Sequence, residues 1–218
     1  MMQKIDFKNK NLDKLMTQAI EKFIEDINLF KKNKICIALS GGNSTKDFYV
    51  ELGKKLKNIK NKKLNFFLLD ERISTKYRNS TQIKKLLGNQ NYYFLKKGNS
   101  TILLRNYNNK LKKNCNQFDI IIAGVGEDGH IASLFPNSDS LNNKEKKYLM
   151  IKNSPKLPPL RISASPKLIT NTKISYIFFI GESKQNAFKN FKNKKIKKID
   201  CPAKLVLKTK LRLITNLK

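Results

Sequence analysis

The chain has 218 residues, of which 39% are hydrophobic, and a formal net charge of +30. This length allows one sizeable core, so we expect a single domain over residues 1–218. No apolar run reaches the ~20 residues of a membrane helix, and the first residues lack the apolar centre of a signal peptide, which predicts a cytoplasmic protein without a membrane partner.

The basic excess is nearly all lysine and is spread through every segment. Only five of the 46 basic residues are arginines, at positions 72, 78, 105, 161 and 212. Arginine is the usual residue for bidentate or stacked phosphate contacts, and no aromatic residues alternate with the arginines to form a stacking platform. We interpret the charge as a bias in amino-acid usage and expect no nucleic-acid partner. A basic nucleic-acid-binding protein on a non-catalytic fold is the remote alternative.

Helical and strand patterns alternate along the first half of the chain. Apolar residues at three- and four-residue steps predict an amphipathic helix over 12–30. The apolar run at 35–39 predicts a buried parallel strand that leads into a turn of small residues. Further expected elements are a helix marked by Phe48, Tyr49, Leu52 and Leu56, a strand over 65–69, and helices over 81–87 and 100–111.

The second half continues this alternation. A strand over 118–123 is broken by Gly124 and Gly126, and residues His130 to Leu134 are predicted to begin a helix. Later expected elements are strands over 148–151 and 176–180, an irregular proline-containing segment over 155–159, a helix over 184–191, and one or two terminal strands over 205–215. Together these patterns predict the α/β class, with a mainly parallel central sheet and helices on both faces.

Cysteine and histidine are scarce. Cys36, Cys115 and Cys201 are widely spaced without a Cys-x-x-Cys pair, so we expect ordinary, partly buried thiols. One histidine and no thiolate cluster leave little material for a transition-metal site. The sequence therefore favours a mechanism without a metal.

Four polar segments follow predicted strands, which is where ligands bind in open parallel sheets. They cover residues 40–44, 70–72, 124–130 and 181–184. The first is a small-residue turn that opens a helix, and its backbone N–H groups suit a phosphate or a carboxylate, although a tight turn with no ligand is equally compatible. It contains neither a Walker lysine nor GxGxxG, so nucleotide binding is not supported.

Two of these segments carry candidate anion-binding side chains. Asp70-Glu71-Arg72 places an arginine at a strand end in a chain that otherwise uses lysine. This favours a need for the planar guanidinium, as in phosphate recognition, with a surface ion pair as the alternative. Lys184 stands at a strand-to-helix turn, and only that position favours it over the other lysines.

The glycine-rich segment 124–136 contains the only histidine, His130. A lone histidine is more often structural, but the flanking glycines let the backbone approach a ligand, and Asp128 is placed to cap the predicted helix. The positive N-terminus of that helix would favour a neutral imidazole. His130 is therefore a candidate general base, with a core or capping role as the alternative.

The content and order of these segments are similar to those of a known family. The chain resembles the 6-phosphogluconolactonase family of the glucosamine-6-phosphate isomerase/lactonase superfamily. Three segments match the family's motifs in order, at residues 39–44, 69–72 and 124–136, and two weaker matches follow at 158–162 and 181–184. The resemblance implies a Rossmann-like α/β fold, no cofactor, and hydrolysis of 6-phospho-D-glucono-1,5-lactone to 6-phospho-D-gluconate in the oxidative pentose phosphate pathway. The expected partner is this small phosphorylated lactone, bound by a monomer.

The same resemblance implies roles for individual residues. His130 would deprotonate the attacking water, and Asp70 and Asp128 would orient the site. Nearby backbone N–H groups would steady the developing oxyanion, and no metal ligand is expected. The residues expected to bind the substrate and its phosphate are Gly41, Gly42, Asn43, Ser44, Arg72, Arg161 and Lys184.

The chain departs from the family pattern at Thr45, Ser74, Thr75, Thr81, Gln82 and Ile131. Ile131 favours the nearest rival, glucosamine-6-phosphate deaminase, which shares the fold and also reads Gly-His-Ile-Ala. That enzyme has Asp-Glu-Tyr where this chain has Arg72, and a ring-opening carboxylate where this chain has Phe135. A closed lactone needs no ring-opening acid, so we expect hydrolysis rather than deamination.

Overall fold

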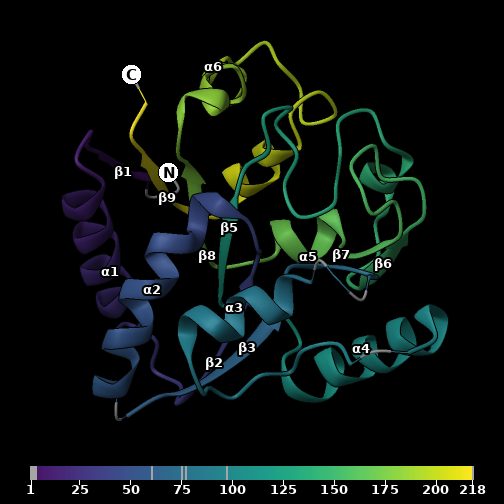
Figure 1. Ribbon diagram of the computed structural model, residues 1–218, viewed down its shortest axis with the longest axis horizontal. Coiled ribbons are helices and arrows are strands. Elements are labelled where there is room, and N and C mark those ends of the chain that lie inside the picture. Colours follow the sequence, from purple (N-terminus) through teal and green to yellow (C-terminus); the bar gives the residue numbers. More distant parts are fainter. Residues whose placement is uncertain (1–3, 60, 75, 77, 97, 218) are drawn as a thin grey trace.

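The computed structural model describes residues 4–59, 61–74, 76, 78–96 and 98–217 (Figure 1). Its centre is a six-stranded sheet in the order β1-β9-β8-β5-β2-β3, and each pair of neighbouring strands in it is parallel. These strands are β1 (Lys4–Lys8), β2 (Lys34–Leu39), β3 (Lys63–Leu68), β5 (Ile120–Gly124), β8 (Ile174–Phe179) and β9 (Lys210–Thr215). The predicted, mainly parallel α/β fold is confirmed.

Helices cover both faces of this sheet. They are α1 (Leu12–Asn28), α2 (Lys46–Lys55), α3 (Asn79–Leu87), α4 (Ser100–Asn114), α5 (Pro166–Thr170) and α6 (Gln185–Lys192). The Phe178 ring of β8 lies 5.1 Å from the Phe48 ring of α2, whereas the next residue, Phe179, lies 5.3 Å from Phe188 of α6. Successive side chains of a strand point to opposite faces, so α2 and α6 lie on opposite sides of the sheet.

Within the described ranges, no helix is long and apolar enough to span a bilayer.

A second sheet continues from the carboxyl end of β3. It consists of three antiparallel strands in the order β4 (Asp70–Arg72), β7 (Arg161–Ala164) and β6 (Tyr148–Ile151). β4 begins two residues after β3 ends, so it carries Asp70 and Arg72 past the edge of the main sheet, and Arg161 is paired in register with Arg72. Asn108 of α4 exchanges two hydrogen bonds with the Tyr148 backbone at 2.7 and 3.2 Å, which covers the edge strand β6.

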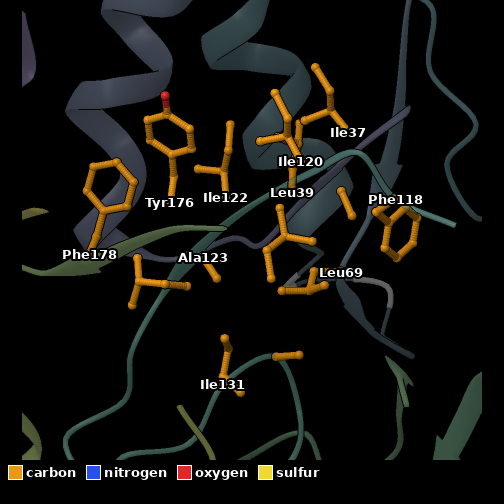
Figure 2. Packing of buried hydrophobic residues seen from close by; sticks show 14 of the residues in the cluster. Ile37, Leu39, Leu69, Phe118, Ile120, Ile122, Ala123, Ile131, Tyr176 and Phe178 are labelled. Atoms are coloured by element: carbon orange, nitrogen blue, oxygen red, sulfur yellow. The ribbon is translucent and has the colours of Figure 1, made fainter. Parts of the chain in front are cut away.

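The core is built from the strands and the inner faces of the helices. Phe23 of α1 is fully buried, and its ring packs edge-on against Tyr176 of β8 at 5.4 Å between centroids. Figure 2 shows Ile131, the residue after His130, among the buried side chains around β5. Because Ile131 is fully buried, the loop that carries the histidine is anchored in the core.

The predicted helix after His130 is wrong. Residues 126–137 form a compact loop of turns, in which Ile131 forms isolated bridges with Val125 and Leu134. Gly129 has a φ of 84° and Ala132 a φ of 56°, in the left-handed region that a right-handed helix does not contain. A helix N-terminus therefore does not act on the imidazole, and another group must orient it.

The other predicted elements are confirmed within a few residues. Over 205–215, where one or two strands are expected, there is one, β9, and it follows the 3-10 segment Pro202–Lys208. The sequence patterns also miss β1, β4, β7 and α5. These elements are short, and each contains charged residues that weaken the apolar periodicity on which the prediction depends.

Two of the three cysteines are not free thiols, contrary to the sequence-based expectation. Cys36 of β2 and Cys115, directly after α4, form a disulfide with their Cα atoms 6.0 Å apart. The two residues are 79 positions apart in the sequence, so their proximity follows only from the fold, which brings the end of α4 to β2. Cys201 is free and buried.

Candidate active site

A cleft of 270 Å³ opens beyond the carboxyl ends of β2, β5 and β8, next to the second sheet. Its volume lies near the lower end for ligand sites, which suits a single sugar phosphate rather than a dinucleotide. Asp128 lies behind His130 and does not line the cleft. The other residues predicted for the site all line it: Gly41, Gly42, Asn43, Ser44, Asp70, Arg72, His130, Arg161 and Lys184.

Asp128 orients the imidazole of His130. Its Oδ1 accepts a hydrogen bond from the backbone N–H of His130 at 3.1 Å and lies 2.5 Å from Nδ1 of the ring. Partial burial raises the pKa of Asp128, but the hydrogen bond and the charge of His130 outweigh this effect and hold the pKa below its usual range. A carboxylate only accepts hydrogen bonds, so Nδ1 carries the proton and Nε2 is left as a proton acceptor.

Gly126 makes room for this ring. A Cβ at position 126 would lie 2.0 Å from Nδ1 of His130 and 2.7 Å from Oδ1 of Asp128. Both distances are far inside van der Waals contact, so any larger residue would push the imidazole away from its carboxylate. The ring also packs against Phe135, with 4.5 Å between centroids. Three neighbours therefore fix the position of the imidazole.

Asp70 supports the same loop from the second sheet. Its Oδ2 accepts a hydrogen bond from the Ser133 hydroxyl at 2.7 Å, and its Oδ1 accepts one from the Asn79 amide at 3.2 Å. Burial raises the pKa of Asp70, and the Ser133 hydroxyl and the charge of Arg161 offset this only in part. The hydrogen bonds described for Asp70 do not include His130, so Asp70 acts on the histidine loop through Ser133.

Two arginines on paired strands face the cleft with different partners. Arg161 is 4% exposed, and its guanidinium donates to the backbone carbonyls of residues 156–158 at 2.7 to 3.2 Å. The Nε of Arg72, in contrast, is buried and has no hydrogen-bond partner in the described part of the chain. Arg161 therefore holds the 156–158 segment at the cleft, whereas the Nε donor of Arg72 has no partner among the described residues.

The turn after β2 is held by side chains from two helices. The Tyr49 hydroxyl of α2 donates to the carbonyl of Ser40 at 2.7 Å, and the backbone N–H of Gly42 donates to Oε1 of Gln82, in α3, at 3.0 Å. The backbone N–H of Gly42 is therefore already paired within the protein. The turn contributes the side chains and the remaining backbone of residues 41–44, which line the cleft.

Lys184 ends a 3-10 turn, Glu182–Lys184, that leads from β8 into α6. Its Nζ lies 3.5 Å from Oε1 of Glu127, which belongs to the loop that carries His130. The Lys184 side chain is 16% exposed and the Glu127 side chain 59% exposed. The lysine is thus enclosed by the cleft wall, and the glutamate reaches it from the solvent side.

The side-chain charges that line the cleft are mostly positive. The cations are Arg72, Lys156, Arg161 and Lys184, and the one carboxyl group among the described lining residues is Asp70. Where the chain is described, no group of three or more His, Cys, Asp and Glu side chains is placed to hold a metal ion. This set of donors suits a phosphate dianion.

Three residues that line the cleft are not identified by the sequence patterns: Asn79, Lys156 and Leu157. Lys156 is hidden among the many lysines of the chain, and its place in the proline-containing segment before Arg161 was the available signal. Leu157 is 87% exposed, so it contributes an apolar residue at the mouth of the cleft.

Comparison with known proteins places these features in a family. The sequence matches the family model described as "Glucosamine-6-phosphate isomerases/6-phosphogluconolactonase" over residues 10–215. The chain belongs to this family. A 6-phosphogluconolactonase of Borreliella burgdorferi is 31% identical over 210 residues, which cover 88% of each chain, and a probable 6-phosphogluconolactonase of Drosophila melanogaster is 32% identical over 74% of this chain and 71% of that protein. The crystal structure of 6-phosphogluconolactonase from Leishmania guyanensis has the same fold, with a TM-score of 0.82 at 20% identity over 99% of this chain and 96% of that one.

Two departures from the family pattern have structural explanations. Thr45 is fully buried, and its hydroxyl donates to the carbonyl of Gly42 at 3.4 Å, so it closes the turn after β2. Ile131 is fully buried, so the side chain at this position packs in the core (Figure 2). Thr75 lies outside the described residues.

Phe135 bears on the choice between the two activities of this family. Its ring lies 4.5 Å from the His130 ring and 5.5 Å from the guanidinium carbon of Arg161. An apolar ring cannot transfer a proton to or from the ring oxygen of a sugar. The residue that we expect to be a ring-opening carboxylate in a deaminase is therefore a buried aromatic ring beside His130, which favours hydrolysis.

Proposed function

We propose that the protein is a 6-phosphogluconolactonase, which hydrolyses 6-phospho-D-glucono-1,5-lactone to 6-phospho-D-gluconate with His130 as general base. The observation that carries the proposal is the Nδ1 contact of His130 with Asp128 beside a cleft that also presents Arg72 and Lys184. The names of its relatives support the same activity. We further propose a cytoplasmic, one-domain monomer that acts in the oxidative pentose phosphate pathway without a metal or a cofactor.

The chemical step requires one base and a fixed substrate. Nε2 of His130 takes a proton from water while the water oxygen attacks the carbonyl carbon of the lactone. The bond between that carbon and the ring oxygen then breaks, and the ring oxygen receives the proton from the imidazolium. The new carboxylic acid ionises, so the products are 6-phosphogluconate and one proton. A positioned general base contributes ~10²–10⁴ in rate, which is adequate for a reactive ester.

The phosphate group, which does not react, anchors the substrate in the cleft. Arg72 has an unpaired Nε for a phosphate oxygen, and Lys184 adds a second charge. Residues 41–44 line the cleft just before α2 and add polar groups near a helix N-terminus. Binding of the non-reacting phosphate holds the lactone carbonyl near Nε2, which lowers the entropic cost of the attack.

Asp70 and Arg161 act as positioning residues in this mechanism. Asp70 fixes Ser133, three residues after the base, and Arg161 fixes the segment that carries Lys156. We expect loss of either side chain to misplace the site without removing a reacting group. Their variants should therefore lose less activity than variants of His130.

The direct test is acid release from freshly prepared 6-phosphogluconolactone, measured against its spontaneous hydrolysis. We expect hydrolysis well above the spontaneous rate, and about 10- to 100-fold lower kcat/KM for glucono-1,5-lactone, which lacks the phosphate and its charged hydrogen bonds. Ammonia release from glucosamine 6-phosphate is measured in parallel. A protein that releases ammonia and leaves the lactone intact is the deaminase, and the proposal is then rejected.

A further inference from the structure

The carboxylate of Glu127 contacts Lys184, the lysine that we propose as a ligand of the substrate phosphate. Its Oε1 lies 3.5 Å from Nζ of Lys184. The charge of Lys184, then that of Lys156, and a hydrogen bond from the Ser183 hydroxyl lower the pKa of Glu127. The Glu127 carboxylate therefore lies at the positive charge of Lys184, where a phosphate oxygen would otherwise bind.

The two members of this ion pair are held differently. The Lys184 side chain is 16% exposed and lines the cleft, whereas Glu127 is 59% exposed and does not line it. An exposed carboxylate is fully hydrated when it turns away from its partner, so the pair gains little free energy from its contact. An arriving anion can thus displace Glu127 into solvent while Lys184 keeps its place.

The reaction itself makes such a competitor useful. The ester of the lactone is neutral, and hydrolysis converts it into a carboxylate, so the product carries one more negative charge than the substrate. A cleft lined by four cationic side chains attracts this product more strongly than the substrate. A group that weakens binding at the phosphate, which substrate and product share, offsets part of this attraction.

We propose that Glu127 is an internal competitor for the phosphate group at Lys184, and that it weakens binding of the phosphorylated product and so promotes its release. This inference rests on the proposed function, because it requires that Lys184 binds the phosphate. Glu127 is a positioning residue, since it contacts Lys184 rather than the reacting atoms.

The experiment is a calorimetric titration of the 218-residue chain with 6-phosphogluconate at low ionic strength. The proteins are the wild type, Glu127→Gln, Lys184→Met and the double variant. We expect Glu127→Gln to bind about two- to fivefold more tightly than the wild type, as for loss of an exposed ion pair. The gain should be absent in the Lys184→Met background and should shrink in about 1 M salt. In steady-state assays, KM and the product inhibition constant should fall by a similar factor, without a rise in kcat.

Two controls separate this effect from a general change of charge. Glu182→Gln removes the same charge two residues from Lys184, and Glu182 is exposed and forms no ion pair in the described segments. It should change the affinity for 6-phosphogluconate by less than about 1.5-fold, because exposed charges without a direct partner are screened. Gluconate, which lacks the phosphate, should bind equally to the wild type and to Glu127→Gln.

Unchanged binding of 6-phosphogluconate by Glu127→Gln would overturn the inference. Weaker binding would also overturn it, because it would show that the glutamate holds Lys184 in place for the ligand. An equal gain in Glu182→Gln would assign the effect to overall charge and reject competition. If the wild type hydrolyses the lactone but Glu127→Gln shows no gain, only this inference fails. A gain in a protein that does not hydrolyse the lactone rejects the proposed function and retains competition at Lys184.

Discussion

Asp26 and Arg72, two charged residues at opposite ends of the main sheet, differ in their hydrogen-bond partners. Toward the amino ends of β8 and β9, Asp26 is fully buried, and Arg212 donates to both of its oxygens at 2.8 and 3.0 Å while Tyr176 donates at 2.7 Å. At the carboxyl ends, Nε of Arg72 is buried without a partner among the described residues, and Lys184 reaches only an exposed carboxylate. A buried charge with a full set of partners maintains the fold, whereas a buried donor without one costs stability, and where its residue lines a cleft, as Arg72 does, it is a candidate ligand contact.

Replacement of His130 has the largest expected effect at the cleft end. His130→Ala removes the base, and we expect lactone hydrolysis to fall ~10²–10⁴-fold. The free energy of unfolding should change little, because the ring lines a cleft rather than the core. His130→Gln retains a polar side chain and should lose as much activity. Hydrolysis at the wild-type rate in either variant would remove His130 from the mechanism.

Removal of Arg212 tests the opposite end of the sheet. Arg212→Met leaves the Asp26 carboxylate buried without its main partner, and we expect a loss of about 3–5 kcal/mol in the free energy of unfolding, measured in urea. Activity per folded molecule should be retained, because Arg212 does not line the cleft. Replacing Asp26 by Leu in the same protein should recover much of the loss. A loss below about 1 kcal/mol would show that this ion pair does little for the fold.

Arg72→Met makes the same arginine-to-methionine change at the cleft that Arg212→Met makes at the opposite end of the sheet. Here we expect the free energy of unfolding to stay within about 0.5 kcal/mol or to rise, because Nε has no partner among the described residues to lose. The kcat/KM for the phosphorylated lactone should fall about 10- to 100-fold, with little change for the unphosphorylated lactone. A large loss of stability with unchanged preference for the phosphorylated lactone would contradict the assignment of Arg72.

The pH dependence of stability should differ in sign between Asp26 and Asp70. Burial raises the pKa of Asp26, but Arg212 and Tyr176 outweigh it and lower the pKa overall, so its stabilisation is present above about pH 4 and is lost as the pH falls. Burial raises the pKa of Asp70, so its contribution is present below about pH 4 and is lost as the pH rises through the folded-state pKa.

The measurement is urea unfolding of the wild type, Asp26→Asn and Asp70→Asn from about pH 3 to pH 7, a range that spans the ordinary carboxyl pKa. The advantage of the wild type over Asp26→Asn should grow with pH, and its advantage over Asp70→Asn should shrink. The same sign for both variants would show that the two carboxyl groups are not in contrasting environments. This is the smallest of the expected effects.

The place of the site could be predicted from the sequence because it follows from topology. Parallel strands end at one edge of a sheet, so the polar residues after each apolar run had to meet, and residues 40–44, Arg72, His130 and Lys184 do line one cleft. The sequence alone could not exclude a helix after His130, because its residue types are compatible with one. The left-handed backbone of Gly129 and Ala132, which prevents the helix, is visible only in the structure. The contact of Asp128 with Nδ1 then supplies the orientation that the helix was expected to give.

Contacts between distant residues could not be predicted from these patterns. Asp70 bonds to Ser133 over 63 positions, and Cys36 pairs with Cys115 over 79, and neither pair has a local signal. Arg161 was expected to contact the substrate, yet most of its described hydrogen bonds go to the backbone of the 156–158 segment. Sequence patterns identify which residue types collect at the cleft, whereas packing decides which of their donors are left for a ligand.

The tautomer of His130 is the most direct test of the proposed mechanism. The chain contains one histidine, so an isotope-labelled sample without an affinity tag gives one pair of imidazole signals in nitrogen NMR, from Nδ1 and Nε2. At about pH 8, where a free imidazole is neutral, we expect the proton on Nδ1, facing Asp128, and a bare Nε2. Asp128→Asn should abolish this preference. A proton on Nε2 in the wild type would leave no base toward the cleft and would contradict the role assigned to His130.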